Sequence, residues 1–358
     1  MTWPGWVAAE SAAVREAGRW RRIRDLDEGL ISFASNDYLG LSQHPAVIAT
    51  AHAALDRWGA GSGAARLVAG SRPVHSELEE DLAAWKGEEA ALLFPTGYAA
   101  NLGVLATMAH AGAHVLSDER NHASIVDGCR LSHAEVCVYR HGEVDHVEEL
   151  LAGWGGPAVV VTDTVFSMDG DVAPVGALAA RCAAWGALLV VDEAHAVLGP
   201  DADLAGVDHL RVGTLSKYLG SLGGYVAGPR ASVDLLVNRA RPFIFTTAST
   251  PADAAAGLAA VAVLRSEEGT ALVDRLRANV ERIAPGHPSP IVPVVVGDEQ
   301  AALDASAALL DRGLLVPAIR PPTVAPGTSR LRISLSATHS DDDLRALLAG
   351  LAELRCAP

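Results

Sequence analysis

The sequence predicts an α/β protein whose mostly parallel central sheet carries helices on both faces, preceded by an N-terminal arm and followed by a smaller α+β domain. Three observations favour this fold class. Short, Val-rich apolar runs alternate with amphipathic helical stretches between about residues 45 and 264, which is typical of strands covered on both faces and joined by right-handed crossovers. The pattern changes near residue 265. A chain of 358 residues is long enough for one large domain and a smaller one.

The N-terminal arm is predicted to span residues 1–40, with one helix and a short strand, because it is polar and Arg-rich until the apolar run at 30–33. The large domain is predicted to span residues 41–264. Its strands are expected in the segment that starts near His209 and at the apolar runs 90–94, 114–116, 136–139, 158–162 and 187–191. The segment 223–228 follows Lys217 so closely that its strand should return antiparallel.

The small C-terminal domain is predicted to span residues 265–358. Its pattern predicts a helix through Leu272, Leu276 and Val280, strands at 291–296 and 331–335, a helix at 299–312 and a last helix from Asp341. Ser340 or Asp341 is expected to cap the last helix, because either side chain can accept a hydrogen bond from its free amide groups.

Charge and composition exclude several classes of function. The formal charge of -15 repels phosphate backbones, so no nucleic-acid partner is expected. The sequence has no uncharged apolar stretch of 18 residues and its first residues lack the pattern of a signal peptide, so no membrane partner and a cytoplasmic location are predicted. The four cysteines show no CxxC spacing, so neither a metal site nor a disulfide is expected.

Lys217 indicates chemistry most directly, because it stands among small and apolar residues in the run 212–220. Burial disfavours the ammonium form of an amine, lowers its pKa and frees the base to condense with an aldehyde. Pyridoxal phosphate (PLP) is the obvious aldehyde. Taken alone, however, a surface lysine at the end of a strand, with only its stem buried, is an equally good interpretation.

Ligands of doubly wound sheets bind beyond the carboxyl ends of the strands, where three candidate groups are expected. Asp192 follows an apolar run and could keep a pyridinium nitrogen protonated, or could simply cap the next turn. His195 could contact the phenolic oxygen of the cofactor or line a turn. His122 opens a predicted helix, where its ring could stack on a planar cofactor or remain a surface group.

The segment 96–101 is predicted to join a strand to a helix, where free amides and the helix dipole form an anion site. Gly97 would let the backbone approach a phosphate. The signal is weak alone, because neither GxxxxGKS nor GxGxxG accompanies it. The glycine-rich segment 59–63 is equally compatible with a flexible turn.

Six motifs occur in the order found in the α-oxoamine synthases, which are fold-type-I PLP enzymes. They are SNDYLGL at 35–41, GSG at 61–63, NHAS at 121–124, VFSMDGD at 165–171, DEAH at 192–195 and TLSK at 214–217. The chain resembles this family from about residue 20 to residue 350. The resemblance implies the fold of a PLP-dependent transferase and the activity of an acyltransferase.

The resemblance implies a role for five residues around the cofactor ring. Lys217 would form the Schiff base with PLP, Asp192 would pair with the ring nitrogen, and His122 would stack on the ring. His195 and Ser167 would bond on the side of the phenolic oxygen.

The resemblance also implies a phosphate site that is completed in a homodimer. Gly97, Tyr98 and Thr214 would bind the cofactor phosphate from one subunit. Thr247 would reach the same phosphate from the second subunit, so activity would depend on dimerisation.

The C-terminal runs 318–324 and 327–332 most resemble the family member that condenses L-alanine with a pimeloyl thioester in biotin biosynthesis. The carrier of the pimeloyl group, coenzyme A or acyl carrier protein, stays open. The prolines of the first run would also be compatible with a rigid surface loop that has no role in substrate choice. The alternatives are a member that joins glycine to acetyl-CoA and a non-catalytic subunit with the same fold.

The resemblance implies four substrate contacts. Asn36 and Arg332 would hold the carboxylate of the amino acid, because a planar guanidinium binds two oxygens at once. Thr323 and Arg21 would contact the acyl chain.

Three departures from the family concern the mouth of the cavity. The loop after His195 is shortened and continues into an acidic stretch with Asp201 and Asp203, and Tyr218 is bulkier than the residue that usually follows the lysine. The proline-rich run has Ala325 before Pro326, where the family more often places proline first. No catalytic group is lost, so the choice of acyl donor is affected more than the reaction.

Overall fold

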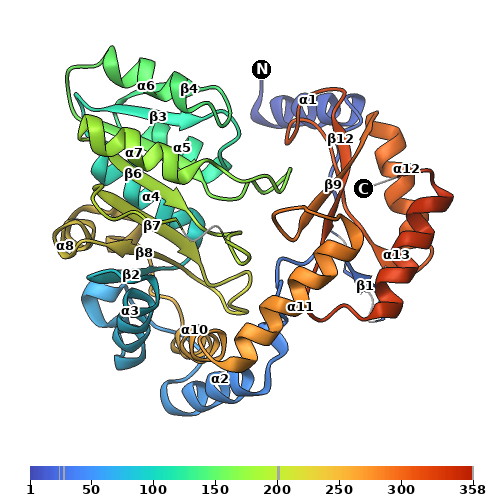
Figure 1. Cartoon of the computed structure of the whole chain (residues 1–358), viewed down its shortest axis with the longest axis horizontal. Helices are drawn as coiled ribbons and strands as arrows, with labels where there is room; N and C mark the ends of the chain where they lie inside the picture. The colour runs from blue at the N-terminus through green and yellow to red at the C-terminus, as the bar shows by residue number, and fades with distance from the viewer. Residues whose placement is uncertain (24, 27–28, 200–201, 357–358) are drawn as a thin grey trace. The chain divides into compact units, whose positions relative to one another are not determined.

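The computed structural model of the protein (Figure 1) describes residues 1–23, 25–26, 29–199 and 202–356. The chain divides into two compact units, Met1–Ile31 and Ser32–Pro358. The first unit contains α1 (Trp3–Glu16), which is capped by Thr2 and has no buried residue. The predicted three-part division with boundaries at 40 and 264 stays a prediction.

The second unit is built on a seven-stranded sheet. Its strands in spatial order are β2 (Ala90–Phe94), β8 (Gly224–Gly228), β7 (His209–Thr214), β6 (Leu188–Asp192), β5 (Ala158–Asp163), β3 (His114–Asp118) and β4 (Glu135–Tyr139). β8 pairs antiparallel with both of its neighbours, and the other pairings are parallel. The predicted mostly parallel sheet and the antiparallel return after Lys217 are thereby confirmed.

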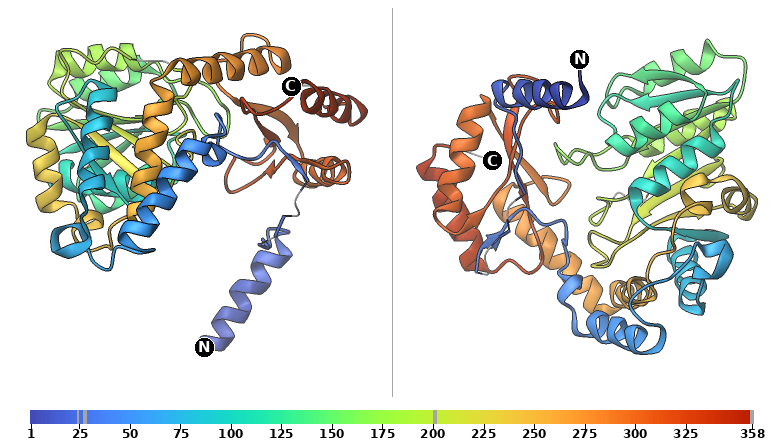
Figure 2. Two further views of the ribbon diagram at one scale, coloured as in Figure 1. Left: turned by 90° about the horizontal axis from the view of Figure 1, so that it is seen from below. Right: turned by 180° about the vertical axis from the view of Figure 1, so that it is seen from behind.

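Helices cover both faces of this sheet, as the turned views also show (Figure 2). Successive strand residues point to opposite faces, so Val159 and Val161 enter one core while Val160 enters the other. The first core is closed by α4 (Gly97–Met108), α5 (Ala123–Leu131), α8 (Arg230–Arg239) and α9 (Arg241–Ile244). The second is closed by α6 (Val144–Ala152) and α7 (Val175–Trp185). Burial on both faces explains why the strand sequences are continuously apolar.

Four longer helices and two short turns complete this part of the chain. They are α2 (Pro45–Trp58), α3 (Pro73–Lys86), α10 (Pro251–Leu264) and α11 (Glu267–Ile283), with a 3₁₀ turn at Leu41–Gln43 and a π-helical turn, η2, at Arg66–Gly70. α10 packs against α2 and α3.

The C-terminal residues form a separate antiparallel sheet of β11 (Ala318–Ile319), β12 (Ser329–Ser334) and β9 (Ile291–Gly297). α12 (Glu299–Leu310) packs on these strands, and α13 (Asp341–Glu353) is capped by Ser340, as predicted. β12 begins and ends earlier than the predicted strand 331–335. The short strands β1 (Ile31–Ser32), β10 (Leu314–Leu315) and β11 have two residues each, and β10 and β11 were not predicted because so short a strand shows no periodicity.

Within the described residues, no helix is long and apolar enough to span a membrane. The cytoplasmic location stays a prediction.

Candidate active site

The predicted site residues of the large sheet gather at one edge, where five strands end. Segments that follow β2, β3, β5, β6 and β7 carry Gly97, His122, Ser167, His195 and Lys217, while Asp192 is the last residue of β6. Parallel strands bring their carboxyl ends to the same edge, as the sequence analysis expected.

Lys217 is one of only two lysines in the chain. Its Nζ lies 2.8 Å from Nε2 of His195. Burial lowers the pKa of this amine from 10.5 to about 8, although the charges of Asp192 and Asp163 oppose the shift. The other lysine, Lys86, lies 2.7 Å from a carboxylate oxygen of Glu193, which outweighs its burial and raises its pKa. Lys217 is therefore the amine that is available as a base near neutral pH.

His195 is buried between Lys217 and Tyr38. Its Nδ1 lies 2.6 Å from the Tyr38 hydroxyl, which also donates to Oδ1 of Asn36 at 3.1 Å. Burial, followed by the positive charges of Lys217 and Arg332, lowers the pKa of His195 well below its usual value. The ring is therefore neutral, so one of its nitrogens accepts a hydrogen bond while the other donates one.

Asp192 is buried and held by two donors. Its Oδ1 accepts from Ala194 N at 2.9 Å, and its Oδ2 accepts from Nδ2 of Asn101 at 2.7 Å. Its neighbour across the strands is Asp163, whose carboxylate accepts from His122 N at 2.7 Å. Burial and the nearby charge of Asp192 raise the pKa of Asp163 well above its usual value. Burial and repulsion within this adjacent pair therefore disfavour the charged form of Asp163.

His122 is the N-cap residue of α5, with an exposed ring held from one side. Its Nδ1 accepts from Ser124 N at 3.3 Å and lies 2.7 Å from Ser124 Oγ, which in turn accepts from Asn101 Nδ2 at 2.9 Å. A backbone N–H can only donate, so Nδ1 is the acceptor and the ring proton is at Nε2. Asn101 thus connects the support of His122 to that of Asp192.

The start of α4, where an anion site is predicted, lies beside the end of β7. Thr96 caps the helix by accepting from Ala99 N at 3.0 Å, and a Cβ on Gly97 would lie 3.2 Å from the Cβ of Thr214. The first amides of a helix have no partner within it, so Gly97 lets them approach an anion beside Thr214. Tyr98 is exposed, and its hydroxyl donates to Asp127.

Arg332 is a buried cation on β12 without an ion pair among the described residues. Its Nε donates to Ser167 O at 2.5 Å, its Nη1 to Ser334 Oγ at 2.7 Å and its Nη2 to Asn36 Oδ1 at 3.1 Å. Arg330, on the same face of the strand, forms an ion pair with Asp169 instead. A buried guanidinium whose partners are all neutral is suited to receive an anion, and Arg332 and Asn36 lie together as expected.

The loop that carries Ser167 is fixed by charged side chains. His141 bridges two carboxylates, with Nδ1 at 2.9 Å from Asp118 and Nε2 at 2.6 Å from Asp171. Burial lowers the pKa of His141, but the hydrogen bonds with Asp118 and Asp171 outweigh burial and raise it. The loop therefore depends on a protonated histidine for its attachment to β3.

The structure gives no direct support for four of the predicted contacts. Thr247 and Thr323 are exposed in loops, and Arg21 is exposed within the first unit. Ser167 meets Arg332 through its carbonyl group. The roles predicted for these four residues stay predictions.

Two departures from the family meet at one pocket. Val197, Leu198 and Gly199 line a pocket of about 430 Å³ together with Tyr218 and Arg277. Asp203 caps a turn by accepting from Ala205 N at 2.9 Å. Asp201 lies outside the described residues.

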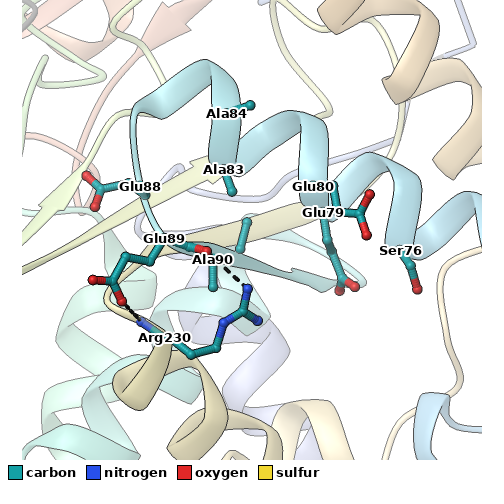
Figure 3. A pocket seen from close by; sticks show the side chains of 10 residues that line it. Ser76, Glu79, Glu80, Ala83, Ala84, Glu88, Glu89, Ala90 and Arg230 are labelled. Carbon is teal, nitrogen blue, oxygen red and sulfur yellow. Dashed lines mark hydrogen bonds between the residues drawn. The ribbon is translucent and has the colours of Figure 1, made fainter.

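A second pocket, of about 440 Å³, is lined by Glu79, Glu80, Glu88, Glu89 and Arg230 (Figure 3). Its carboxylates serve the protein itself: Glu79 pairs with Arg66, and Glu89 accepts from Arg230 N at 2.9 Å. None of the predicted site residues lines it, so it is separate from the candidate site. Elsewhere, His114, Glu135 and Cys137 place ligand-type atoms within 4.8 Å of one another. The expectation of no metal ion stays a prediction.

The cluster fits PLP in four respects. It offers an amine with a lowered pKa, a buried carboxyl group at the neighbouring strand end, a histidine ring held at its edge and a helix start that glycine opens to an anion. These match an aldehyde, a pyridine nitrogen, an aromatic ring and a phosphate respectively.

Sequence reasoning missed four residues that support this cluster: Tyr38, Asn101, Ser124 and Asp163. Tyr38 and Ser124 lie within quoted motifs, and Asn101 is the last residue of the segment proposed for the phosphate. Asp163 ends an apolar run as Asp192 does, which was the available signal for it.

Comparison with known proteins gives concordant results. Residues 28–351 match the family of class I and II aminotransferases. A protein from Anaeromyxobacter dehalogenans named 8-amino-7-oxononanoate synthase is 48% identical, with 97% of this chain and 94% of that protein covered. A Methylobacterium protein of the same name is 46% identical, with 98% and 97% covered.

Among solved structures, serine palmitoyltransferase from S. paucimobilis with a bound PLP–myriocin aldimine has a TM-score of 0.89 at 30% identity. The match covers 98% of this chain and 97% of that one. The α/β fold predicted from the sequence, with its PLP-enzyme architecture, is confirmed.

Proposed function

Since the chain belongs to the class I and II aminotransferase family and, within it, to the 8-amino-7-oxononanoate synthases, we propose that it condenses L-alanine with a pimeloyl thioester. The products are 8-amino-7-oxononanoate, carbon dioxide and the free thiol of the carrier, and the reaction belongs to biotin biosynthesis. The enzyme is a PLP-dependent acyltransferase.

One observation carries the proposal. Of the two lysines, one is locked in an ion pair, and the other has a lowered pKa and lies close to Asp192, His195 and a buried arginine that has no ion pair within the described part of the chain. An amine, an acid and a carboxylate receptor so close together suit chemistry at the Cα of an amino acid.

The cofactor would be held by Lys217, by Asp192 at its ring nitrogen, by His122 against its ring, and by the start of α4 with Thr214 at its phosphate. When bound, PLP supplies an electron sink that stabilises negative charge at Cα of the amino acid.

The chain itself orients the substrate and moves protons. Arg332 and Asn36 bind the alanine carboxylate and so fix the Cα–H bond relative to the Lys217 amine. When free, that amine takes the Cα proton at Nζ, and its pKa of about 8 lets it do so near neutral pH. His195 Nε2 lies 2.8 Å from the same atom and orients it.

The enzyme is proposed to act as a homodimer in which Thr247 reaches the phosphate of the neighbouring subunit. Leu67 and Val68 on η2 and Phe245 after α9 are large apolar side chains that are exposed in the single chain. η2 packs against α9, so they lie in one region close to Thr247. Exposed apolar residues gathered in this way are typical of a protein interface.

A direct assay tests the proposed function. Purified protein loaded with PLP is given L-alanine with pimeloyl-CoA or the pimeloyl carrier protein, and the amino ketone is measured by mass spectrometry alongside carbon dioxide. We expect one of each per thiol released and none with Lys217→Ala. A preference for glycine with acetyl-CoA would contradict the substrate assignment and leave the family assignment intact.

A further inference from the structure

Tyr38 lies fully buried beside the candidate site, although neither the motif nor the comparisons give it a role. Its ring packs against His195, with 6.0 Å between ring centroids, and its hydroxyl is shared between His195 Nδ1 and Asn36 Oδ1. A buried phenol is costly unless it is hydrogen-bonded, so these two contacts are required for its position.

These contacts belong to an unbroken chain of hydrogen bonds. Lys217 Nζ lies 2.8 Å from His195 Nε2, and His195 Nδ1 lies 2.6 Å from the Tyr38 hydroxyl. Tyr38 then donates to Asn36 Oδ1 at 3.1 Å, and Arg332 Nη2 donates to the same oxygen at 3.1 Å. The chain runs from the reactive amine to the carboxylate receptor.

Donor and acceptor rules allow two proton arrangements in this chain. When Lys217 is an ammonium it can only donate, so His195 Nε2 accepts, Nδ1–H donates to the Tyr38 oxygen, and the Tyr38 proton goes to Asn36. When Lys217 is a neutral amine, the order can reverse: Tyr38 donates to Nδ1, and Nε2–H donates to the amine. Only a hydroxyl, which both donates and accepts, serves His195 in both states.

The other charged groups do not replace Tyr38 in this role. Lys217 faces Asp192, Asp163 and Arg332, whereas His195 faces the cations Lys217 and Arg332 and the ring of His122. Tyr38 itself faces the Arg332 guanidinium, which stays in place in the Tyr38→Phe variant. Among the described residues, no carboxylate is hydrogen-bonded to His195, so its tautomer is set by Lys217 and Tyr38.

We propose that Tyr38 is a positioning residue of this active site, whose hydroxyl sets which ring nitrogen of His195 carries the proton facing Lys217. The assignment rests on the proposed function for its catalytic meaning, while its structural basis is the hydrogen-bond chain alone. When Lys217 is an ammonium, the Nδ1–H of His195 donates to the Tyr38 hydroxyl. Removing this hydroxyl leaves the Nδ1–H without an acceptor, which disfavours the ammonium form of Lys217.

The test measures the protonation of Lys217 directly, in Tyr38→Phe and in wild type without cofactor. Only two lysines are present, so labelling with trinitrobenzenesulfonate at graded pH, followed by peptide mass spectrometry, separates Lys217 from Lys86. In wild type, half-maximal reactivity of Lys217 is expected near pH 8. In Tyr38→Phe the pH of half-maximal reactivity of Lys217 should fall by roughly half to one unit, which is the shift expected for one lost hydrogen bond. The pH of half-maximal reactivity of Lys86 should not change.

A double-mutant cycle separates positioning through His195 from a packing effect. In a His195→Gln background, Tyr38→Phe should no longer shift the pKa of Lys217. Tyr139→Phe, in the second core, is the matched control and should shift neither lysine. If Tyr38→Phe does not fold, Asn36→Ala removes the acceptor of the Tyr38 proton and should lower the pKa of Lys217 in the same direction.

The outcomes are decisive in both directions. A folded Tyr38→Phe protein with the wild-type pKa at Lys217, or an equal shift in the His195→Gln background, overturns the proposal. Labelling requires neither PLP nor substrate, so a wild-type protein that fails to condense alanine refutes the proposed function alone. In the active enzyme, Tyr38→Phe should lower kcat roughly fivefold to tenfold and change the KM for alanine by less than about twofold, since Asn36 and Arg332 remain.

Discussion

Two arginines on one strand face different partners, and this difference supports the proposed receptor for the substrate carboxylate. Arg330 and Arg332 stand two residues apart on β12 and both are buried, yet within the described ranges only Arg330 has a carboxylate partner, Asp169. Desolvating a guanidinium is costly unless an anion compensates. The guanidinium of Arg332 therefore remains able to form an ion pair, and the alanine carboxylate would form it.

Arg332→Lys should weaken alanine binding by about 1.5 to 3 kcal/mol, because an ammonium cannot reproduce a two-point contact with a carboxylate. The KM for alanine is expected to rise roughly tenfold to 150-fold. The KM for the thioester should change little. Arg330→Lys is the matched control, and an equal rise in that variant would remove the distinction between the two arginines.

Asp192→Asn should slow exchange of the alanine Cα proton by roughly 10²- to 10³-fold, the usual cost of removing one electrostatic stabiliser. The amide keeps the contact with Asn101 but lacks the negative charge that would keep the ring nitrogen of the cofactor protonated. NMR of alanine in deuterated water measures the exchange. Asp163→Asn is the control: the pKa of this carboxyl is raised, and the amide oxygen of the variant can still accept from His122 N, so the exchange rate should stay close to wild type.

At the scale of elements, the loop 164–173 depends on the protonation of His141. The folded pKa of His141 is raised, so its contribution to stability is complete below the unfolded value of about 6.5 and is lost as pH rises through the folded pKa. His141→Gln should therefore lower the urea midpoint more at pH 6 than at pH 9. A difference that is independent of pH would show that His141 acts by packing alone.

The elements that the sequence predicts well are those with strong local signals. Continuous apolar runs located the strands of the large sheet, and Ser340 marked the start of α13. The π-helical turn at Arg66–Gly70 was missed. The ion pair between Arg66 and Glu79 on α3 holds this turn, and no local sequence pattern predicts such an ion pair.

At the scale of the molecule, the proposed reactive groups have a local sequence signal, whereas the residues that support them depend on tertiary contacts. Lys217, Asp192 and His122 follow apolar runs, so topology alone predicts that they gather. Tyr38 and His195 are 157 residues apart, and Asn101 and Asp192 are 91 apart. Their hydrogen bonds depend on side-chain directions that only the packed structure defines.

Assembly provides the prediction for the whole molecule. Val68→Asp places a charge in the exposed apolar region next to Thr247 and should give a folded monomer by light scattering. Activity should fall by at least tenfold because the phosphate site is then incomplete. Val138→Asp, on the exposed edge strand β4, is the control. A fully active monomer would contradict the proposed dimeric site.

The contact between Asn36 and Arg332 also has a consequence for biosynthesis. The two residues are separated by 296 positions, so their hydrogen bond closes one of the longest loops available to the chain. At roughly 5–20 residues per second, a ribosome needs about 15 to 60 s to add Arg332 after Asn36. During that time Lys217 can emerge and fold with the large sheet while the proposed receptor for the substrate carboxylate does not yet exist. The nascent enzyme would thus gain its amine early and its selectivity for amino acids only when translation is nearly complete.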